Sequence, residues 1–376
     1  MSGDTKSRAG PVRIGISGSY GGMNLGDEAI LEAILLQLRA AADVEVTVFS
    51  MNPSDTLARH TVEHAINARS LTRKEIAPII GGLDLLILGG GGILFDDEAQ
   101  AYLREVNLAH KLGVRVFVYA ISAGPLTKHA SRQAVQEALN ASPSTVITVR
   151  DRLGYRLLED VGVTQEIHLT ADPAFLLEPD PLPDKVLKAE GVEFTRELVG
   201  FSVREPGPAA PDINPDEYHE LLANAADYMV ERFDANVLFV PMEKIDVQHS
   251  HSVVAHMRYA ERAEVLRRRY APRQILDLMG RLEFAVGMRL HFLIFAALHG
   301  IAFSPLPYAS KVRGLLDDLG MDTPPLSGMG IGQLTARIDR KWDTRAEVRA
   351  KIQDKVPELK RRARRTHELL MGVLGQ

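Results

Sequence analysis

The strongest constraint on the fold of this 376-residue chain is an alternation of short apolar runs with segments of helical periodicity. In the first half, strands are expected at Val12–Ser17, Val44–Phe49, Leu83–Leu88, Val114–Ala120 and Thr145–Val149, and helices at Asp27–Ala40, Glu98–Leu112, Ser131–Leu139 and Asp151–Asp160. Most of the strand runs are apolar nearly throughout, as expected for strands covered on both faces. The pattern therefore predicts a parallel sheet built from βαβ units.

The same alternation starts again after a proline-rich stretch, Leu177–Lys188. The second set of strands is expected at Val199–Val203, Asn236–Val240, Phe284–Val286 and Ile301–Ser304, with helices at Glu217–Arg232, Arg273–Met279, Leu290–Leu298 and Lys311–Leu319. We predict an N-terminal domain over 11–180, a linker over 181–196, a second domain over 197–342, and a helical tail over 343–376 broken at Pro357. The fold class is α/β, with two doubly wound domains and a ligand cleft between them.

Composition excludes several classes of function. The net charge of −5 argues against a nucleic-acid-binding protein, and the absence of cysteine excludes disulfides and thiolate metal sites. No metal-ligand spacing is visible, so neither a metal nor a bound cofactor is expected. The first ten residues carry no apolar signal segment, and the apolar stretch Ile76–Phe95 contains Asp84 and several glycines. We therefore expect a cytoplasmic protein.

Two basic runs are interpreted as solvated helix faces, namely Arg267–Arg269 and Lys360–Arg365. The second run could also dock on an anionic surface, which would place the protein peripherally at the inner membrane face.

The loop after the first expected strand is rich in glycine and includes Gly21, Asn24 and Asp27. Its glycines would allow a ligand to approach the backbone closely. It has no dinucleotide-binding fingerprint, and Asp27-Glu28 stand where a phosphate-binding loop needs Lys and Ser/Thr. Asn24 or Asp27 could cap the following helix, and the loop could also bind a sugar.

A second glycine run, Gly89–Gly92, follows another expected strand and precedes Asp96 and Asp97. Gly90 and Gly91 are candidates for lining a ligand site. Either aspartate could act as a base or bind hydroxyls, and the alternative is a tight turn with a helix cap.

Two arginines come directly after expected strands, Arg150 in the first domain and Arg204 in the second. Guanidinium groups bind carboxylates and phosphates bidentately, so a pair facing one cleft would suit an anionic ligand. The alternative for each is a salt bridge at the surface.

The strongest local feature is Gly287-Met288-Arg289-Leu290-His291, at an expected strand-to-helix junction. Backbone N–H groups at a helix start bind anions, Arg289 adds a permanent charge, and His291 can transfer a proton near neutral pH. Lys311 comes at the start of a later helix and is a candidate anion ligand or a solvated lysine.

At these residues the chain resembles the polysaccharide pyruvyl transferase family. The stretches that carry the resemblance run in order from about Val12 to Met321: GSYGGMNLGDEAIL, LGGGGILFDD, ISAGP, VRDRLG, ADPAF, FSVRE, VPMEKID, AVGMRLHFLIFAALHG and YASKVRGLLDDLG. The set is specific, whereas each piece alone would be weak.

The resemblance implies two Rossmann-like domains of the GT-B kind with the active site in the interdomain cleft. It also implies cell-wall or exopolysaccharide biosynthesis, with phosphoenolpyruvate as donor, two hydroxyls of a sugar as acceptor, a pyruvate ketal as product and phosphate released. Arg289 and His291 match the Arg-x-His motif tied to donor binding and acid–base chemistry. Arg204 matches the arginine that opens the second domain, and Asp96 or Asp97 matches the acidic residue after the glycine run.

Two other functions remain open at this point. A GT-B glycosyltransferase that uses a nucleotide sugar would share the architecture and would release a nucleotide instead of phosphate. A sugar- or anion-binding protein without activity could use the same scaffold. The sequence also leaves open which sugar is the acceptor, which hydroxyls react, and the oligomeric state.

Overall fold

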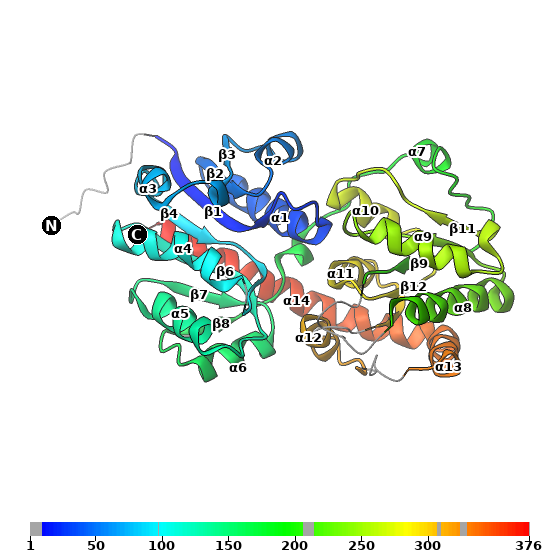
Figure 1. Cartoon of the computed structure of the whole chain (residues 1–376). Helices are drawn as coiled ribbons and strands as arrows, with labels where there is room; N and C mark the ends of the chain where they lie inside the picture. The colour runs from blue at the N-terminus through cyan, green and yellow to red at the C-terminus, as the bar shows by residue number, and fades with distance from the viewer. Residues whose placement is uncertain (1–9, 97, 206–213, 307–309, 324–328, 376) are drawn as a thin grey trace. The chain divides into compact units, whose positions relative to one another are not determined.

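The computed structural model describes residues 10–96, 98–205, 214–306, 310–323 and 329–375. They form two compact units, each built on its own sheet (Figure 1). Unit 1 comprises Met1–Gly22, Ile30–Pro173 and Arg362–Gln376, and unit 2 comprises Met23–Ala29 and Ala174–Arg361.

Unit 1 contains an eight-stranded sheet whose order is β3-β2-β1-β4-β6-β7-β8, with β5 also paired to β6. The strands are β1 (Val12–Tyr20), β2 (Val44–Ser50), β3 (His64–Ile66), β4 (Leu85–Leu88), β5 (Gly91–Leu94), β6 (Arg115–Ala123), β7 (Val146–Val149) and β8 (Ile167–Leu169), and the helices are α1 (Leu25–Ala41), α2 (Pro53–Arg59), α3 (Arg73–Gly81), α4 (Ala99–Lys111), α5 (His129–Asn140) and α6 (Arg152–Val161). Every pairing is parallel, for example Ile14 with Val46.

Unit 2 contains a five-stranded parallel sheet of order β11-β10-β9-β12-β13. Its strands are β9 (Leu198–Ser202), β10 (Asn236–Phe239), β11 (Ala263–Val265), β12 (Phe284–Gly287) and β13 (Ala302–Pro305), and its helices are α7 (Asp184–Lys188), α8 (Pro215–Phe233), α9 (Asp246–His256), α10 (Pro272–Met279), α11 (Leu290–Leu298), α12 (Ser310–Asp318), α13 (Ile331–Asp343) and the first part of α14 (Arg345–Leu374).

Burial on both faces explains the continuous apolar strands. In unit 1, Leu86 and Leu88 belong to one buried cluster and Leu85 and Ile87 to another, because successive side chains of a strand point to opposite faces. In unit 2, helix α11 is buried from Leu290 to Ala297, which fits a helix that is apolar all round. The predicted α/β class with two parallel sheets is confirmed.

The expected break at Pro357 is wrong, because α14 runs unbroken from Arg345 to Leu374. A proline inside a helix removes one backbone hydrogen bond. Packing offsets that loss, since Leu370 and Val373 join a buried cluster of unit 1 and Arg115 donates to the carbonyl of Val373. The C-terminal end of α14 therefore belongs to unit 1, whereas the sequence analysis predicts a separate tail.

Two other segments differ from the expected boundaries. The stretch Met23–Ala29, which lies in the predicted first domain, groups with unit 2. Within the glycine run, Gly91 and Gly92 form the start of strand β5 instead of a loop. Glycine-rich sequence does not predict a strand, and pairing with β6 holds the segment extended.

Gly21 is required by the backbone and by packing. Its φ is +76°, and a Cβ there would lie 2.2 Å from Ser50 Oγ and 2.6 Å from the backbone nitrogen of Asn52. We expect Gly21→Ala to lower the free energy of unfolding by about 1–3 kcal/mol, measured by urea denaturation. Gly22→Ala is the matched control, since its Cβ would meet the flexible Met51 Cε. Equal losses in both variants would contradict this explanation.

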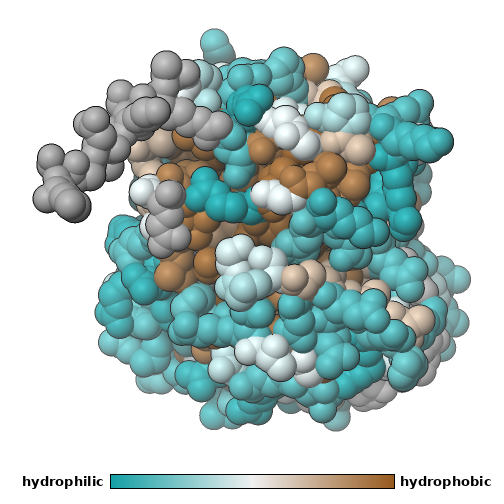
Figure 2. All heavy atoms as spheres, turned by 90° about the vertical axis from the view of Figure 1, so that its left-hand side faces the viewer, coloured by the Kyte–Doolittle hydropathy of each residue, from teal (hydrophilic) through white to brown (hydrophobic). Residues whose placement is uncertain are grey.

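No helix in the described ranges combines the length and apolar character needed to span a bilayer. On the face of unit 1 seen in Figure 2, hydrophobic residues are spread across the middle and upper part, and the lower half is mostly hydrophilic. In the basic run, Arg361 pairs with Glu358 and Arg362 donates to the carbonyl of Thr170. Docking of this run on a membrane stays a prediction.

Candidate functional site

The residues with the clearest chemistry gather at the carboxyl edge of the sheet in unit 2. From β9 the chain builds outwards to β10 and β11, and then crosses to the other side of β9 to form β12 and β13. The loops after β9 and β12 therefore flank a topological switch point, where open parallel sheets bind ligands. Arg204 follows β9, and Arg289 and His291 follow β12.

Arg289 is the centre of a buried ion cluster. Its Nε donates to Asp246 Oδ2 at 2.9 Å and its Nη2 to Glu243 Oε2 at 2.6 Å, and Nη2 also pairs with Asp246 Oδ1. Asp246 is completely buried and Arg289 is 6% exposed, while the side chain of Glu243 is 33% exposed. The guanidinium orientation is therefore fixed by two carboxylates.

Asp246 also organises the loop that carries it. Its Oδ2 accepts hydrogen bonds from the backbone N–H groups of Met242 and Glu243, both at 3.1 Å. Burial raises the pKa of Asp246, and Arg289 together with the N–H of Met242 opposes that rise. The sequence analysis treats Arg289 as an added positive charge. The structure corrects this expectation, because the carboxylates of Asp246 and Glu243 offset the positive charge of Arg289.

His291 lies in the first turn of α11 and is 9% exposed. The segment Met23–Ala29 packs against it: a Cβ at Gly26 would lie 2.0 Å from His291 Nδ1. The backbone of Leu25 donates to the carbonyl of Met242 at 2.7 Å, and Gly26 donates to Asn24 Oδ1 at 2.9 Å. The first glycine-rich loop therefore contributes to the unit 2 site.

This contact makes Gly26 a sensitive probe of the imidazole position. Gly26→Ala is expected to displace His291 and to lower kcat at least tenfold. The free energy of unfolding should fall by about 1–3 kcal/mol, because the added methyl group overpacks the contact. Enzyme turnover and urea denaturation measure the two effects. Gly22→Ala in the same loop is the control, and unchanged kcat in Gly26→Ala would show that the contact does not position the imidazole.

Three residues of this cluster were missed by the sequence analysis, namely Tyr218, Glu243 and Asp246. Tyr218 is buried on α8, its hydroxyl contacts Met288 Sδ, and burial raises its pKa while Arg204 opposes the rise. The available signal for Glu243 and Asp246 was the stretch VPMEKID after an expected strand. Tyr218 carried no signal, because it lies inside a helix remote in sequence.

Arg204 and Lys311 occupy the expected positions after strands. Arg204 Nε donates to the carbonyl of Glu205 at 2.9 Å. Lys311 lies in the first turn of α12, which follows β13, the neighbour of β12 in the sheet. Their donor-binding roles stay predictions.

Arg150 belongs to unit 1, where it forms a buried ion pair. Its Nη1 donates to Asp172 Oδ2 at 2.6 Å, and both side chains are almost fully buried. Asp172 belongs to the ADPAF stretch. The alternative expected for Arg150 was a salt bridge at the surface. The structure shows a salt bridge that is buried instead. A Cβ at Gly92 would lie 4.0 Å from Arg150 Nη2, so the glycine run passes close to this pair.

Asp96 caps the chain before α5. Its carboxylate accepts from the backbone N–H groups of Thr127 and Lys128 and from the Thr127 hydroxyl at 2.5 Å. These bonds, with that of the Thr127 side chain foremost, lower the pKa of Asp96 to about 2. Asp96 therefore binds the segment that leads into α5, whereas α4, the helix that follows the glycine run, has no side-chain cap bond. So acidic a group is a weak base. Asp97 lies outside the described residues.

The remaining loop candidates have structural contacts. A Cβ at Gly90 would meet Ile30 Cγ2 at 2.9 Å, and Gly91 has a φ of +104°. Asn24 accepts from Gly26, as the capping interpretation requires, and Asp27 lies in the first turn of α1. Among the described residues, no group of three or more His, Cys, Asp or Glu side chains could hold a metal ion.

The cap at Asp96 predicts a pH-dependent stability. A carboxylate with a lowered pKa stabilises the fold above its unfolded-state pKa, and that contribution is lost as the pH falls towards about 2. The Tm difference between wild type and Asp96→Asn should therefore be present at pH 6 and shrink between about pH 4 and 2. Differential scanning calorimetry measures it, and a difference independent of pH would contradict the ionised cap.

The model of one protein family matches the chain over residues 24–310, and that family is described as polysaccharide pyruvyl transferase. A comparison with curated proteins gives no match. Among solved structures, the UDP-GlcNAc 2-epimerase of Neisseria meningitidis, bound to UDP-GlcNAc, is similar with a TM-score of 0.65 and 8% identity, covering 97% of this chain and 99% of that one.

Two further solved structures share the architecture. HepE of Anabaena, in complex with UDP, has a TM-score of 0.62 and 14% identity, and a glycosyltransferase of Rickettsia africae has a TM-score of 0.61 and 13% identity. Each likeness covers 97% of this chain and 99% of the other. At these identities the likeness shows the fold alone, which is that of GT-B glycosyltransferases and epimerases. Since the family model covers most of its length, the chain belongs to the polysaccharide pyruvyl transferase family.

Proposed function

We propose that the protein transfers the pyruvyl group of phosphoenolpyruvate to two hydroxyls of one sugar, forming a pyruvate ketal and releasing phosphate. One observation carries the proposal: a chain of this family holds an arginine and a histidine together at the switch point of its second sheet, with the arginine anchored by Asp246 and Glu243. The acceptor belongs to polysaccharide biosynthesis, as a nucleotide-linked sugar, a lipid-linked sugar or the polysaccharide itself.

The reaction needs a proton donor at the vinyl carbon and hydrogen-bond donors for a carboxylate and a phosphate. Protonation of the CH₂ group makes a methyl group and an electron-poor C2, which the first hydroxyl attacks with loss of its proton. The C2–O bond to phosphate then breaks, and the second hydroxyl takes that place. One hydroxyl proton balances the proton given to carbon, and the other leaves with phosphate.

His291 is the proposed acid, because it lies in the first turn of α11, directly after β12, and an imidazole can serve as a general acid. In the same proposal Arg289 and the N-terminus of α11 orient the donor. Arg289 is the N-cap residue of α11, and its side chain makes no cap bond to that helix. Since Asp246 and Glu243 balance its charge, we expect it to act as a rigid hydrogen-bond donor more than as an excess cation.

The other proposed contacts follow from the sequence. Arg150, Arg204 and Lys311 would bind the donor. Gly21, Asn24, Asp27, Gly90 and Gly91 would contact the acceptor. Of the two aspartates, Asp97 would take a hydroxyl proton, because the lowered pKa of Asp96 makes it a weak base. Placement of the chemistry between the two domains stays a prediction, as does action in the cytoplasm.

The decisive experiment mixes the purified protein with phosphoenolpyruvate and a panel of nucleotide-linked, lipid-linked and polymeric sugars. Mass spectrometry should detect a pyruvate ketal on one acceptor, with stoichiometric release of phosphate. Arg289→Lys should be nearly inactive in the same assay. The ammonium group of lysine lacks the planar set of N–H donors with which a guanidinium can bind both carboxylates and a ligand at once. Ketal formation without phosphoenolpyruvate would overturn the donor assignment.

A glycosyltransferase that uses a nucleotide sugar is the second candidate, supported by the likeness of the fold to proteins solved with UDP or UDP-GlcNAc. The products separate the two functions: this enzyme would release a nucleotide, and the pyruvyl transferase would release phosphate. A binding protein without activity would release neither.

A further inference from the structure

A cavity of about 690 Å³ with several charged residues in its wall lies beside β13, the edge strand of the unit 2 sheet. Its wall is built from the end of β13, the segment after α12, and helices α13 and α14; the lining residues used below are Ser304, Asp322, Lys341, Glu347 and Lys351. None of its lining residues belongs to the Arg289–His291 cluster. All but Ser304 and Pro305 lie beyond residue 310, where the family match ends.

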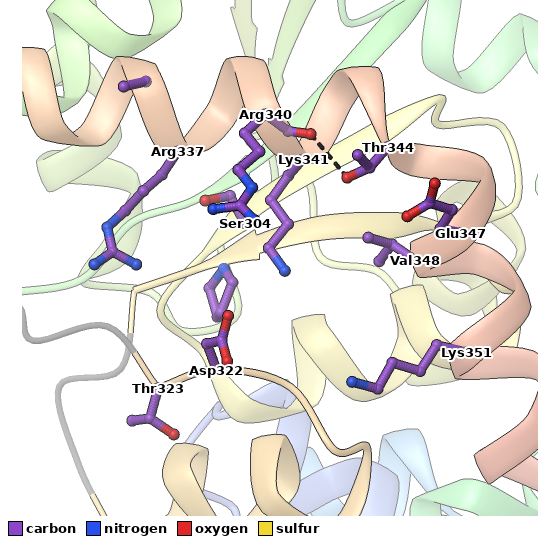
Figure 3. Close-up of a pocket in the computed structure, with 12 residues that line it drawn as sticks. Ser304, Asp322, Thr323, Arg337, Arg340, Lys341, Thr344, Glu347, Val348 and Lys351 are labelled. Carbon is purple, nitrogen blue, oxygen red and sulfur yellow. Dashed lines mark hydrogen bonds between the residues drawn. The ribbon is translucent and has the colours of Figure 1, made fainter.

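Positive charge dominates this cavity. Figure 3 shows Arg337, Arg340 and Lys341 reaching from α13 and Lys351 from α14 towards the same space. Among the described lining residues, four cations face the two carboxylates of Asp322 and Glu347, so two positive charges are in excess. None of the four cationic side chains forms an ion pair with any residue that the structure describes.

Like charges are therefore held together at some energetic cost. Lys341 is partly buried, and its pKa is lowered by that burial and by Lys351, Arg340 and Arg337, against the opposing effect of Asp322. An anion bound among these groups would remove the repulsion. The volume exceeds that of phosphate alone and is typical of a site for a small organic ligand.

We propose that this cavity binds a phosphorylated sugar. Guanidinium and ammonium groups hold phosphate by charge-assisted hydrogen bonds. The carboxylates of Asp322 and Glu347 and the hydroxyl of Thr323 suit the hydroxyls of a sugar ring. Among the described residues that line the cavity none is aromatic, so they offer no ring on which a nucleobase could stack. Binding in this cavity would depend neither on the pyruvyl donor nor on the proposed roles of Arg289 and His291.

Calorimetric titration of the full chain tests the ligand class at fixed ionic strength. Glucose 1-phosphate should bind more tightly than inorganic phosphate, and glucose should not bind measurably. Equal affinities for the two phosphates would overturn the sugar assignment. Absence of binding by either phosphate at millimolar concentration would overturn the site.

Variants then locate the binding. Lys341→Gln and Lys351→Gln, from different helices, should each raise the Kd for glucose 1-phosphate about tenfold or more, as expected for loss of one charge-assisted hydrogen bond. Lys355→Gln is the matched control, since it removes a lysine of α14 that is not part of the cavity wall. Binding that is unchanged in both cavity variants, or weakened equally in Lys355→Gln, would overturn the proposal.

Discussion

Replacing His291 by glutamine should lower kcat by about 10²–10⁴-fold and leave the KM for phosphoenolpyruvate within a few-fold of wild type. Glutamine keeps a polar side chain in the first turn of α11 but cannot give up a proton to carbon. Steady-state kinetics with the acceptor found by mass spectrometry measure both constants.

His299→Gln is the matched control for this experiment. His299 caps the other end of α11, and its Nε2 lies 2.7 Å from the carbonyl oxygen of Leu276. That contact is structural, so kcat should stay near the wild-type value even if stability falls. A kcat that is unchanged in His291→Gln would remove His291 from the proposed mechanism, whatever the result for His299.

The local pattern of apolar residues was sufficient to predict most of the strands and helices of the fold. The apolar runs and their spacing predict the principal strands and helices, because strands covered on both faces and amphipathic helices leave distinct periodicities. The short strands β3, β8 and β11 were missed, since three residues carry no period. Pro357 was misjudged because packing of Leu370 and Val373 cannot be inferred from the proline itself.

The site was predictable where chemistry follows a strand directly in sequence. Arg204, Arg289 and His291 could be found because parallel strands bring their carboxyl ends to one edge. The pairing of Arg289 with Asp246 could not be found, because these residues are 43 positions apart and nothing local couples them. The same limit applies to Gly26, where a side chain would collide with the imidazole of His291 on α11, a residue distant in sequence.

Asp246→Ala is expected to lower the free energy of unfolding by about 3–5 kcal/mol, because it removes the buried carboxylate that pairs with Arg289 and leaves only the partly exposed Glu243. It also removes the acceptor of the Met242 and Glu243 backbone N–H groups, so the loop after β10 should lose its conformation. Chemical denaturation measures the loss, and kcat/KM should fall with it because the guanidinium of Arg289 is no longer oriented.

A double-mutant cycle separates the ion pair from the rest of this effect. Once Arg289 is replaced by methionine, Asp246 has no charge to neutralise, so the second substitution should cost much less than it does alone. Glu243→Gln is the matched control: its carboxylate is partly exposed, and the loss should be about 1 kcal/mol or less. If the losses of unfolding free energy for the Asp246 and Arg289 substitutions are additive, the carboxylate stabilises only its own loop, through the Met242 and Glu243 N–H groups. A large coupling together with lost turnover would identify Asp246 as the residue that positions Arg289 for its proposed role.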